Sequence, residues 1–270
     1  MLRSWGLEPV YPPAMLEGWG YLAGDDKTRG DWLQKALLDP EIRAVVCARG
    51  GYGASRLVEA LDWKKIAAQG KRFVGFSDIT FLHLAWLQKT SWMTFHGPML
   101  ASRQMLEGSQ ESRDSLHRAL FAETLSELFP PLSGTPLQTG VASGTLWGGN
   151  LSLLISTLGT PWQPELTDSI LILEDVSEPP YRLDRMFQQL RQAGILDSIA
   201  GLAIGDMGRL KDQYSSYTSG EFWLERLRLP SIPIVTDLPV GHIADNRVVP
   251  LGAQVTLDAE QGLLSLSSST

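Results

Sequence analysis

Ser77 lies where a short apolar run meets a strongly apolar segment that is predicted to be helical. The run Val74-Gly75-Phe76-Ser77-Asp78 leads directly into that segment. A serine on a sharp strand-to-helix turn is presented above a sheet, where helix N–H groups and the helix dipole favour a developing oxyanion. The pattern resembles the nucleophile elbow G-x-S-x-G, although Ile79 replaces the second glycine. The alternative interpretation is a helix N-cap, for which Ser and Asp are preferred.

A glycine-rich segment follows another buried strand-like run. It reads Arg49-Gly50-Gly51-Tyr52-Gly53-Ala54-Ser55-Arg56. Glycines let the backbone approach a ligand closely and direct N–H groups at it. The segment is therefore compatible with an oxyanion hole, with a phosphate-binding loop or with a plain turn. The match to the dinucleotide motif G-x-G-x-x-G is poor, and we find no acidic residue closing a second strand at the expected distance.

The four histidines differ in their sequence surroundings. His83 lies in the apolar segment and is expected in the core, whereas His117 lies in a charged stretch and is expected in solvent. His96 precedes Gly-Pro at a strand end and can therefore approach a site. His242 sits in a loop after a strand-like run, and such loops commonly hold catalytic groups. Close metal-ligand spacing is absent among them, and with one cysteine no zinc site is expected.

Acidic residues follow the buried run Ile170-Leu171-Ile172-Leu173. Glu174 and Glu178 are both candidates to orient an imidazole, and both are also compatible with a solvated turn. A nucleophile, a base, an acidic orienting residue and a donor loop together fit acyl transfer.

The elements that must position these residues alternate along the first half of the chain. This alternation predicts βαβ units with a parallel sheet, and the second half is richer in strands and turns. The predicted helices cover 31–38, 53–61, 79–88 and 181–193. The predicted strands cover 43–48, 71–76, 92–95, 170–173 and 199–204, followed by an alternating pattern at 248–266. Prolines, serine and glycine at 130–136 place a domain boundary near 125–140.

Composition excludes several classes of protein. The 270 residues carry a net charge of −7, which argues against nucleic-acid binding. Cys47, the only cysteine, cannot form an intramolecular disulfide, so a reducing compartment is expected, and it is predicted to lie in a buried strand. We find no signal peptide and no membrane span, which would need roughly 18–20 apolar residues. A cytoplasmic protein without a membrane partner is therefore expected.

At these residues the sequence resembles the LD-carboxypeptidase family, which includes the microcin C immunity peptidases. Matching segments run through nearly the whole chain in the order of the family. They are Ala48–Gly53, Gly75–Asp78, His96–Pro98, Gly144–Leu151, Leu173–Asp175, Tyr181–Met186 and Gly241–His242. The resemblance implies a Ser77–His242–Glu174 triad, an oxyanion hole made by the backbone N–H groups of Gly51 and Asp78, no metal or organic cofactor, and a homodimer.

The resemblance also implies the domain organisation. An α/β domain of flavodoxin or Rossmann type over 1–125 carries the serine. A linker over 126–140 and a smaller β-rich domain over 141–270 follow, the latter with the glutamate and histidine. Family members begin with a strand and a helix, of which roughly 30 residues are not found here. Losing a strand would expose a sheet edge.

The implied substrate is a murein tetrapeptide from cell-wall recycling, cleaved to release terminal D-alanine. Arg49 is a candidate to bind the free carboxylate, or else belongs to a surface salt bridge. The rival substrate within the family is a peptidyl- or aminoacyl-nucleotide. A nucleotide-binding protein using 49–53 and an inactive module that captures murein peptides remain the alternatives outside this enzyme class.

Overall fold

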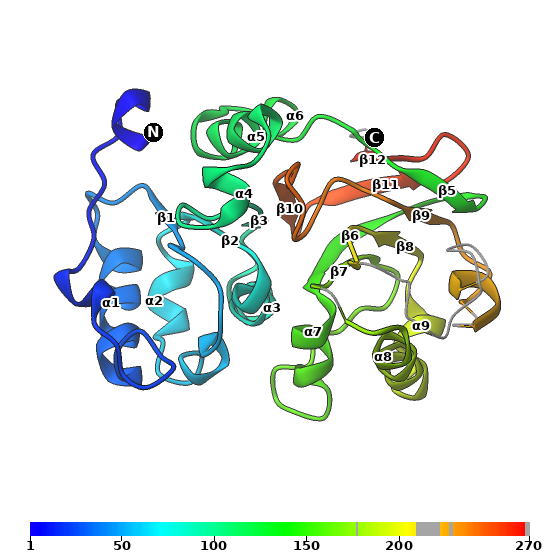
Figure 1. Ribbon diagram of the computed structural model, residues 1–270, viewed down its shortest axis with the longest axis horizontal. Coiled ribbons are helices and arrows are strands. Elements are labelled where there is room, and N and C mark those ends of the chain that lie inside the picture. The colour runs from blue at the N-terminus through cyan, green and yellow to red at the C-terminus, as the bar shows by residue number, and fades with distance from the viewer. Residues whose placement is uncertain (177, 209–221, 227–228, 268–270) are drawn as a thin grey trace.

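The strands of the protein form two sheets that lie side by side across the molecule (Figure 1). The computed structural model describes residues 1–176, 178–208, 222–226 and 229–267. Among these residues one sheet has four strands and the other has eight. This mixed α/β architecture, with a parallel N-terminal sheet and a strand-rich C-terminal part, confirms the predicted fold class.

The first sheet carries the segment with Ser77. Its order is β1-β2-β3-β10, in which β1 to β3 run parallel and β10 pairs antiparallel with β3. The strands are β1 (Ala44–Val46), β2 (Arg72–Gly75), β3 (Thr94–His96) and β10 (Val249–Leu251). The connecting helices are α1 (Asp26–Leu38), α2 (Trp63–Ala67) and α3 (Thr80–Thr90). β10 comes from the far end of the chain and ties the C-terminal part into this sheet.

The second sheet has a parallel centre with antiparallel edges. Its order is β4-β12-β11-β6-β7-β8-β9-β5, and β6 to β9 are parallel. The strands are β4 (Leu132–Ser133), β5 (Thr135–Gln138), β6 (Val141–Asn150), β7 (Ile170–Glu174), β8 (Gly201–Ile204), β9 (Ile234–Thr236), β11 (Gln254–Asp258) and β12 (Leu263–Leu266). β7 is buried at all five positions, as expected for a central parallel strand.

Shorter elements complete the chain. The remaining helices are α4 (Arg103–Leu106), α5 (Gln110–Phe121), α6 (Leu125–Leu128), α7 (Leu151–Thr157), α8 (Pro180–Gln192) and α9 (Ile195–Ser198). Single 3₁₀ turns are η1 (Leu2–Trp5), η2 (Pro13–Leu16), η3 (Ala54–Arg56) and η4 (Ser77–Ile79), and a π-helical turn is η5 (Phe222–Arg226). Asn150 ends β6 and caps α7, because its side chain accepts from Leu153 N.

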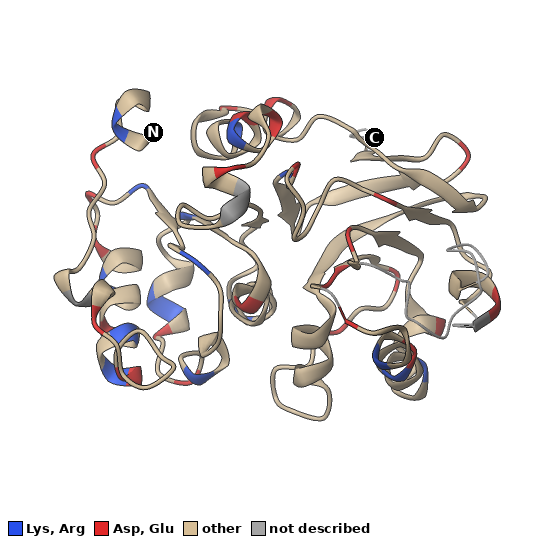
Figure 2. Cartoon of the chain, viewed as in Figure 1, with Lys and Arg blue, Asp and Glu red and all other residues tan. Residues whose placement is uncertain are grey.

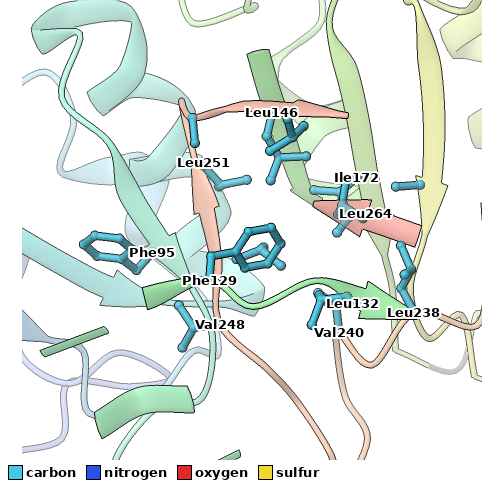
Figure 3. Packing of buried hydrophobic residues seen from close by; sticks show 14 of the residues in the cluster. Phe95, Phe129, Leu132, Leu146, Ile172, Leu238, Val240, Val248, Leu251 and Leu264 are labelled. Carbon is cyan, nitrogen blue, oxygen red and sulfur yellow. The ribbon is translucent and has the colours of Figure 1, made fainter. Parts of the chain in front are cut away.

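An apolar core joins the two sheets (Figure 3). Phe95 of β3 and Leu251 of β10 lie in the same cluster as Leu146 of β6, Ile172 of β7 and Leu264 of β12. All five are at most 5% exposed. Burial of each such side chain contributes about 1.5–3 kcal/mol, so the two sheets are held together by the hydrophobic effect.

Three local predictions need correction. Residues 53–61 form the short turn η3 followed by further turns rather than a helix, because Gly53 has φ 117° and Ala54 N–H is bound by the side chain of Asp78. His117 is half-buried, since its ring stacks on that of Phe121 at 4.5 Å. Cys47 follows β1 and is only half-buried.

Candidate active site

Ser77 sits in a strained turn between β2 and α3. Its φ is 62°, in the left-handed region that residues other than glycine rarely adopt. Such a conformation costs of order 1–3 kcal/mol and persists only where the surrounding structure holds the residue in place. Gly75 is required just before the turn, because an added Cβ would lie 2.7 Å from Cγ2 of Ile79. The strand, tight turn and helix therefore reproduce the local geometry expected of a nucleophile elbow.

Three side chains from distant segments form one chain of hydrogen bonds. His242 Nε2 lies 3.2 Å from Ser77 Oγ, and His242 Nδ1 lies 2.7 Å from Glu174 Oε2. Ser77 follows β2, Glu174 ends β7, and His242 lies in the loop after β9. Glu178, the other candidate acid, instead pairs with Arg182 at 3.1 Å. The structure thus brings Glu174, and not Glu178, to the imidazole.

The acidic residues around His242 favour the protonated form of its imidazole. Burial acts to raise the pKa of Glu174, but its hydrogen bond to His242 and the nearby His96 outweigh burial and lower that pKa to about 2. Burial likewise acts to lower the pKa of His242, but the carboxylate of Glu174, with Asp175 and Asp206, raises it above its usual value of 6.5. An ionised carboxylate therefore faces an imidazole that readily takes up a proton.

The loop that carries His242 is fixed by contacts that the sequence analysis missed. The Gly241 N–H donates to Asn246 Oδ1 at 3.0 Å. A Cβ on Gly241, where φ is 119°, would lie 3.0 Å from Glu174 Oε2, so only glycine allows this approach. The N-terminus of α5 also holds this loop, because Ser109 N–H and Ser112 Oγ both donate to Ala244 O at 3.0 Å. In the sequence, only Gly241 next to His242 indicated that this loop is closely packed against the site.

The glycine-rich segment lies against the serine. A Cβ on Gly50 would be 3.0 Å from Ser77 Cβ. Gly51 has φ 111°, and its N–H donates to no acceptor within the described ranges. The side chain of Asp78 accepts from Ala54 N–H at 2.8 Å and so links this segment to the serine turn. Arg49 is exposed, and its side chain forms no hydrogen bond or ion pair with the other described residues.

Two further histidines, His83 and His96, are buried near the same site. His96 is fully buried, and its Nε2 lies 3.6 Å from Glu174 Oε1. His83 is in the core, as predicted, and its Nε2 donates to Gly75 O at 2.8 Å. Burial lowers the pKa of His83 to about 3, so it stays neutral. His96 therefore approaches the site, whereas His83 only supports the strand before it.

A cavity of about 240 Å³ opens beside the histidine loop. It lies past the ends of β8 and β9, and Asp206 and Ile243 are among its lining residues. Burial raises the pKa of Asp206. A second hollow, of about 620 Å³, follows the exposed face of α8 and contains none of the three aligned residues.

Charged residues are distributed unevenly around these elements. Acidic residues follow the end of β7, whereas α1 and α8 each carry both basic and acidic residues (Figure 2). In the part of the chain that the structure describes, no set of three or more His, Cys, Asp or Glu side chains is grouped to hold a metal ion. None of the helices described there is long and apolar enough to cross a membrane.

Comparison with known proteins identifies the family. The N-terminal domain of the LD-carboxypeptidase family matches residues 1–97, and its C-terminal domain matches residues 143–257. A Bacillus subtilis protein named probable murein peptide carboxypeptidase is 36% identical over 96% of this chain and 82% of its own length.

Solved structures agree with this assignment. A muramoyltetrapeptide carboxypeptidase from Oxalobacter formigenes has a TM-score of 0.84 and 34% identity over 98% of this chain and 90% of its own. The microcin C7 self-immunity protein MccF has a TM-score of 0.85 at 22% identity over 99% of this chain and 88% of its own, which shows a shared fold. The chain therefore belongs to the LD-carboxypeptidase family.

Proposed function

We propose that this protein is a serine carboxypeptidase that hydrolyses the bond between an L-centre and a terminal D-alanine in murein tetrapeptide, in peptidoglycan recycling. Ser77 is the nucleophile, His242 the general base and Glu174 the residue that orients the base. The observation that carries the proposal is the line from Ser77 Oγ to His242 Nε2 at 3.2 Å and from His242 Nδ1 to Glu174 Oε2 at 2.7 Å.

Acylation begins when His242 Nε2 takes the proton from Ser77 Oγ. The oxygen attacks the carbonyl carbon of the scissile bond, and the electron pair of the C=O bond moves onto its oxygen. Glu174 holds the Nδ1–H of His242 and stabilises the imidazolium that forms. The imidazolium then gives its proton to the leaving amine of D-alanine, and the C–N bond breaks to leave an acyl-enzyme on Ser77.

The oxyanion of the tetrahedral intermediate needs donors that are already in place. The proposed donors are the backbone N–H groups of Gly51 and Asp78. Two contacts support this choice: Gly50 lies against Ser77, and the Asp78 carboxylate anchors Ala54 N–H at the end of the same glycine-rich segment. Deacylation repeats the sequence with water as the nucleophile, and His242 returns the proton to Ser77 Oγ.

The murein substrate rests on the names of two relatives, the murein peptide carboxypeptidase of B. subtilis and the muramoyltetrapeptide carboxypeptidase of O. formigenes. A carboxypeptidase must also recognise the free terminal carboxylate. Arg49 is proposed for this contact, because it is exposed and directly precedes Gly50, on which an added Cβ would lie 3.0 Å from Ser77 Cβ. A guanidinium pairs well with a carboxylate through two parallel hydrogen bonds.

The proposal includes the organisation expected from the family. The serine belongs to a domain over 1–125, the linker covers 126–140, and Glu174 and His242 belong to a domain over 141–270, so that the site forms between two domains.

A cytoplasmic homodimer is proposed on the same grounds. Sedimentation equilibrium of the purified protein tests the dimer, and a mass of one chain at micromolar concentration would contradict it.

A panel of substrates tests the proposed reaction. The purified protein is incubated with L-Ala-γ-D-Glu-meso-diaminopimelyl-D-Ala, with its C-terminal amide, with its terminal L-Ala isomer and with an aminoacyl-nucleotide. Mass spectrometry follows the products. Release of D-alanine from the free acid alone supports the proposal. Cleavage of only the nucleotide conjugate would overturn the murein assignment, and binding without any cleavage would indicate an inactive binding module.

A further inference from the structure

The two oxygens of the Glu174 carboxylate have different surroundings. Oε2 accepts from His242 Nδ1 at 2.7 Å. Oε1 is buried and has no hydrogen-bond partner among the described residues, and His96 Nε2 faces it at 3.6 Å. A buried carboxylate oxygen without a partner is energetically costly. The position of His96 is therefore where a balancing donor is needed.

His96 is held in place without a hydrogen bond of its own. It ends β3 and is fully buried, and neither ring nitrogen has a hydrogen-bond partner within the described part of the chain. The ring of Phe76 contacts it edge-on, with centroids 6.0 Å apart. Gly149, where φ is 121°, makes room for it, because an added Cβ would lie 3.1 Å from His96 Cδ2. Packing thus orients the imidazole toward Glu174.

The neighbouring buried histidine, His83, is bonded to the backbone rather than to a carboxylate. His83 lies 6.2 Å from His96 between ring centroids, and its Nε2 donates to the carbonyl of Gly75. A carbonyl oxygen can only accept, so the proton of His83 is already committed to the backbone. Of these two buried rings, His96 is the one that faces a carboxylate.

We propose that His96 is a positioning residue of the active site: its Nε2–H holds Oε1 of Glu174, so that Oε2 stays aligned with Nδ1 of His242. The inference rests on the proposed function, because it assigns His96 to the same reaction. At 3.6 Å the contact is longer than a hydrogen bond, as is common in active sites without substrate, where such contacts tighten in the Michaelis complex. Glu174 is then shared by imidazoles from both sheets.

Removal of this donor has a predictable electrostatic effect. In His96→Leu the carboxylate loses one partner, so it becomes more basic and raises the pKa of His242 further. The midpoint of the acid limb of kcat/KM is expected to move up by about one pH unit. We expect kcat to fall about tenfold with KM unchanged, because the alignment matters to the transition state rather than to binding.

Other titratable groups near these rings must be held constant in the comparison. His83 faces His96 from α3, whereas Glu174, Asp175 and Asp206 act on His242 from β7 and from beyond β8. All of them are retained in the variant. His96→Gln is the conservative replacement, because its amide places an N–H close to the position of Nε2. His83→Leu is the control for the loss of a buried histidine without a carboxylate partner.

The expected pattern is an upward shift of the acid limb in His96→Leu, a midpoint near the parent value in His96→Gln, and no shift in His83→Leu. A lower melting temperature of His96→Leu with an unchanged midpoint would overturn the inference and leave His96 a packing residue. Histidine ¹⁵N NMR of the unmodified protein gives a readout that needs no turnover and no stable variant. A proton on His96 Nε2 at neutral pH supports the inference, and a bare Nε2 refutes it even if the enzyme is active.

Discussion

Gly50 lies directly against Ser77, so that a Cβ on the glycine would stand 3.0 Å from Ser77 Cβ and 3.2 Å from its Oγ. The φ of Gly50 is not positive, so alanine fits the backbone and would disturb only the neighbouring side chain. We expect Gly50→Ala to lower kcat/KM by about 10- to 100-fold, because small displacements of a nucleophile are costly.

The matched control for this change is Gly30→Ala. Gly30 lies within α1, and no atom lies within 4 Å of its added Cβ. It should gain about 0.5–1 kcal/mol of stability and keep its turnover, because alanine is the better helix former. Steady-state kinetics together with thermal melts separate the two effects. Equal activity of both variants would show that Gly50 does not restrict the serine.

Glu174→Gln should nearly abolish turnover. The amide cannot stabilise an imidazolium and favours the wrong tautomer of His242, for which losses of about 10³- to 10⁴-fold are typical. Glu178→Gln removes only an ion pair with Arg182, whose side chain is 54% exposed, and should leave kcat within about twofold. A large loss in Glu178→Gln with normal turnover of Glu174→Gln would reverse the assignment of the orienting acid.

The pH dependence follows from the raised pKa of His242. The general base must be neutral to accept the proton of Ser77, and it is protonated below its pKa. Since Glu174 raises that pKa above 6.5, kcat/KM should rise with pH through a midpoint above 6.5. The profile is measured with substrate well below KM. A midpoint clearly below 6.5 would mean that burial outweighs the carboxylate in the free enzyme.

Gly148 and Gly159 offer a paired test of the close packing behind the site. Both have positive φ, at 132° and 74°. A Cβ on Gly148 would overlap the carbonyl oxygen of Ile172 on β7, whereas the space around Gly159 is open. Gly148→Ala should lose about 3 kcal/mol or more and Gly159→Ala about 1 kcal/mol, by urea unfolding. Similar losses would contradict the close strand approach.

The sequence was most informative where chemistry and local structure coincide. A buried apolar run ending in Glu174, and another leading into Ser77, predicted strands β7 and β2 with their side chains at the ends. The resemblance to a family selected Ser77, His242 and Glu174 as a set, and it favoured Glu174 over Glu178. In the structure these three residues are joined by two hydrogen bonds, and their roles stay predictions.

Contacts between distant segments could not be predicted in this way. Nothing local to Val249–Leu251 indicates that it joins the first sheet as β10, because strand pairing depends on how the whole chain packs. The same holds for Ser109 on the carbonyl of Ala244 and for His96 beside Glu174. Helix α5 was missed because its residues are mostly polar, and its stability comes from packing one face.

The most direct test of the central claim compares D-alanine release by the parent protein, Ser77→Ala and Ser91→Ala. Release is measured by mass spectrometry, and a thermal melt first confirms that each sample is folded. Ser91 is a matched control, because it also has a positive φ, 58°, but lies exposed at the end of α3. Ser77→Ala should lose at least about 10³-fold of the turnover, and Ser91→Ala should keep it. Near-normal release by Ser77→Ala would contradict the account.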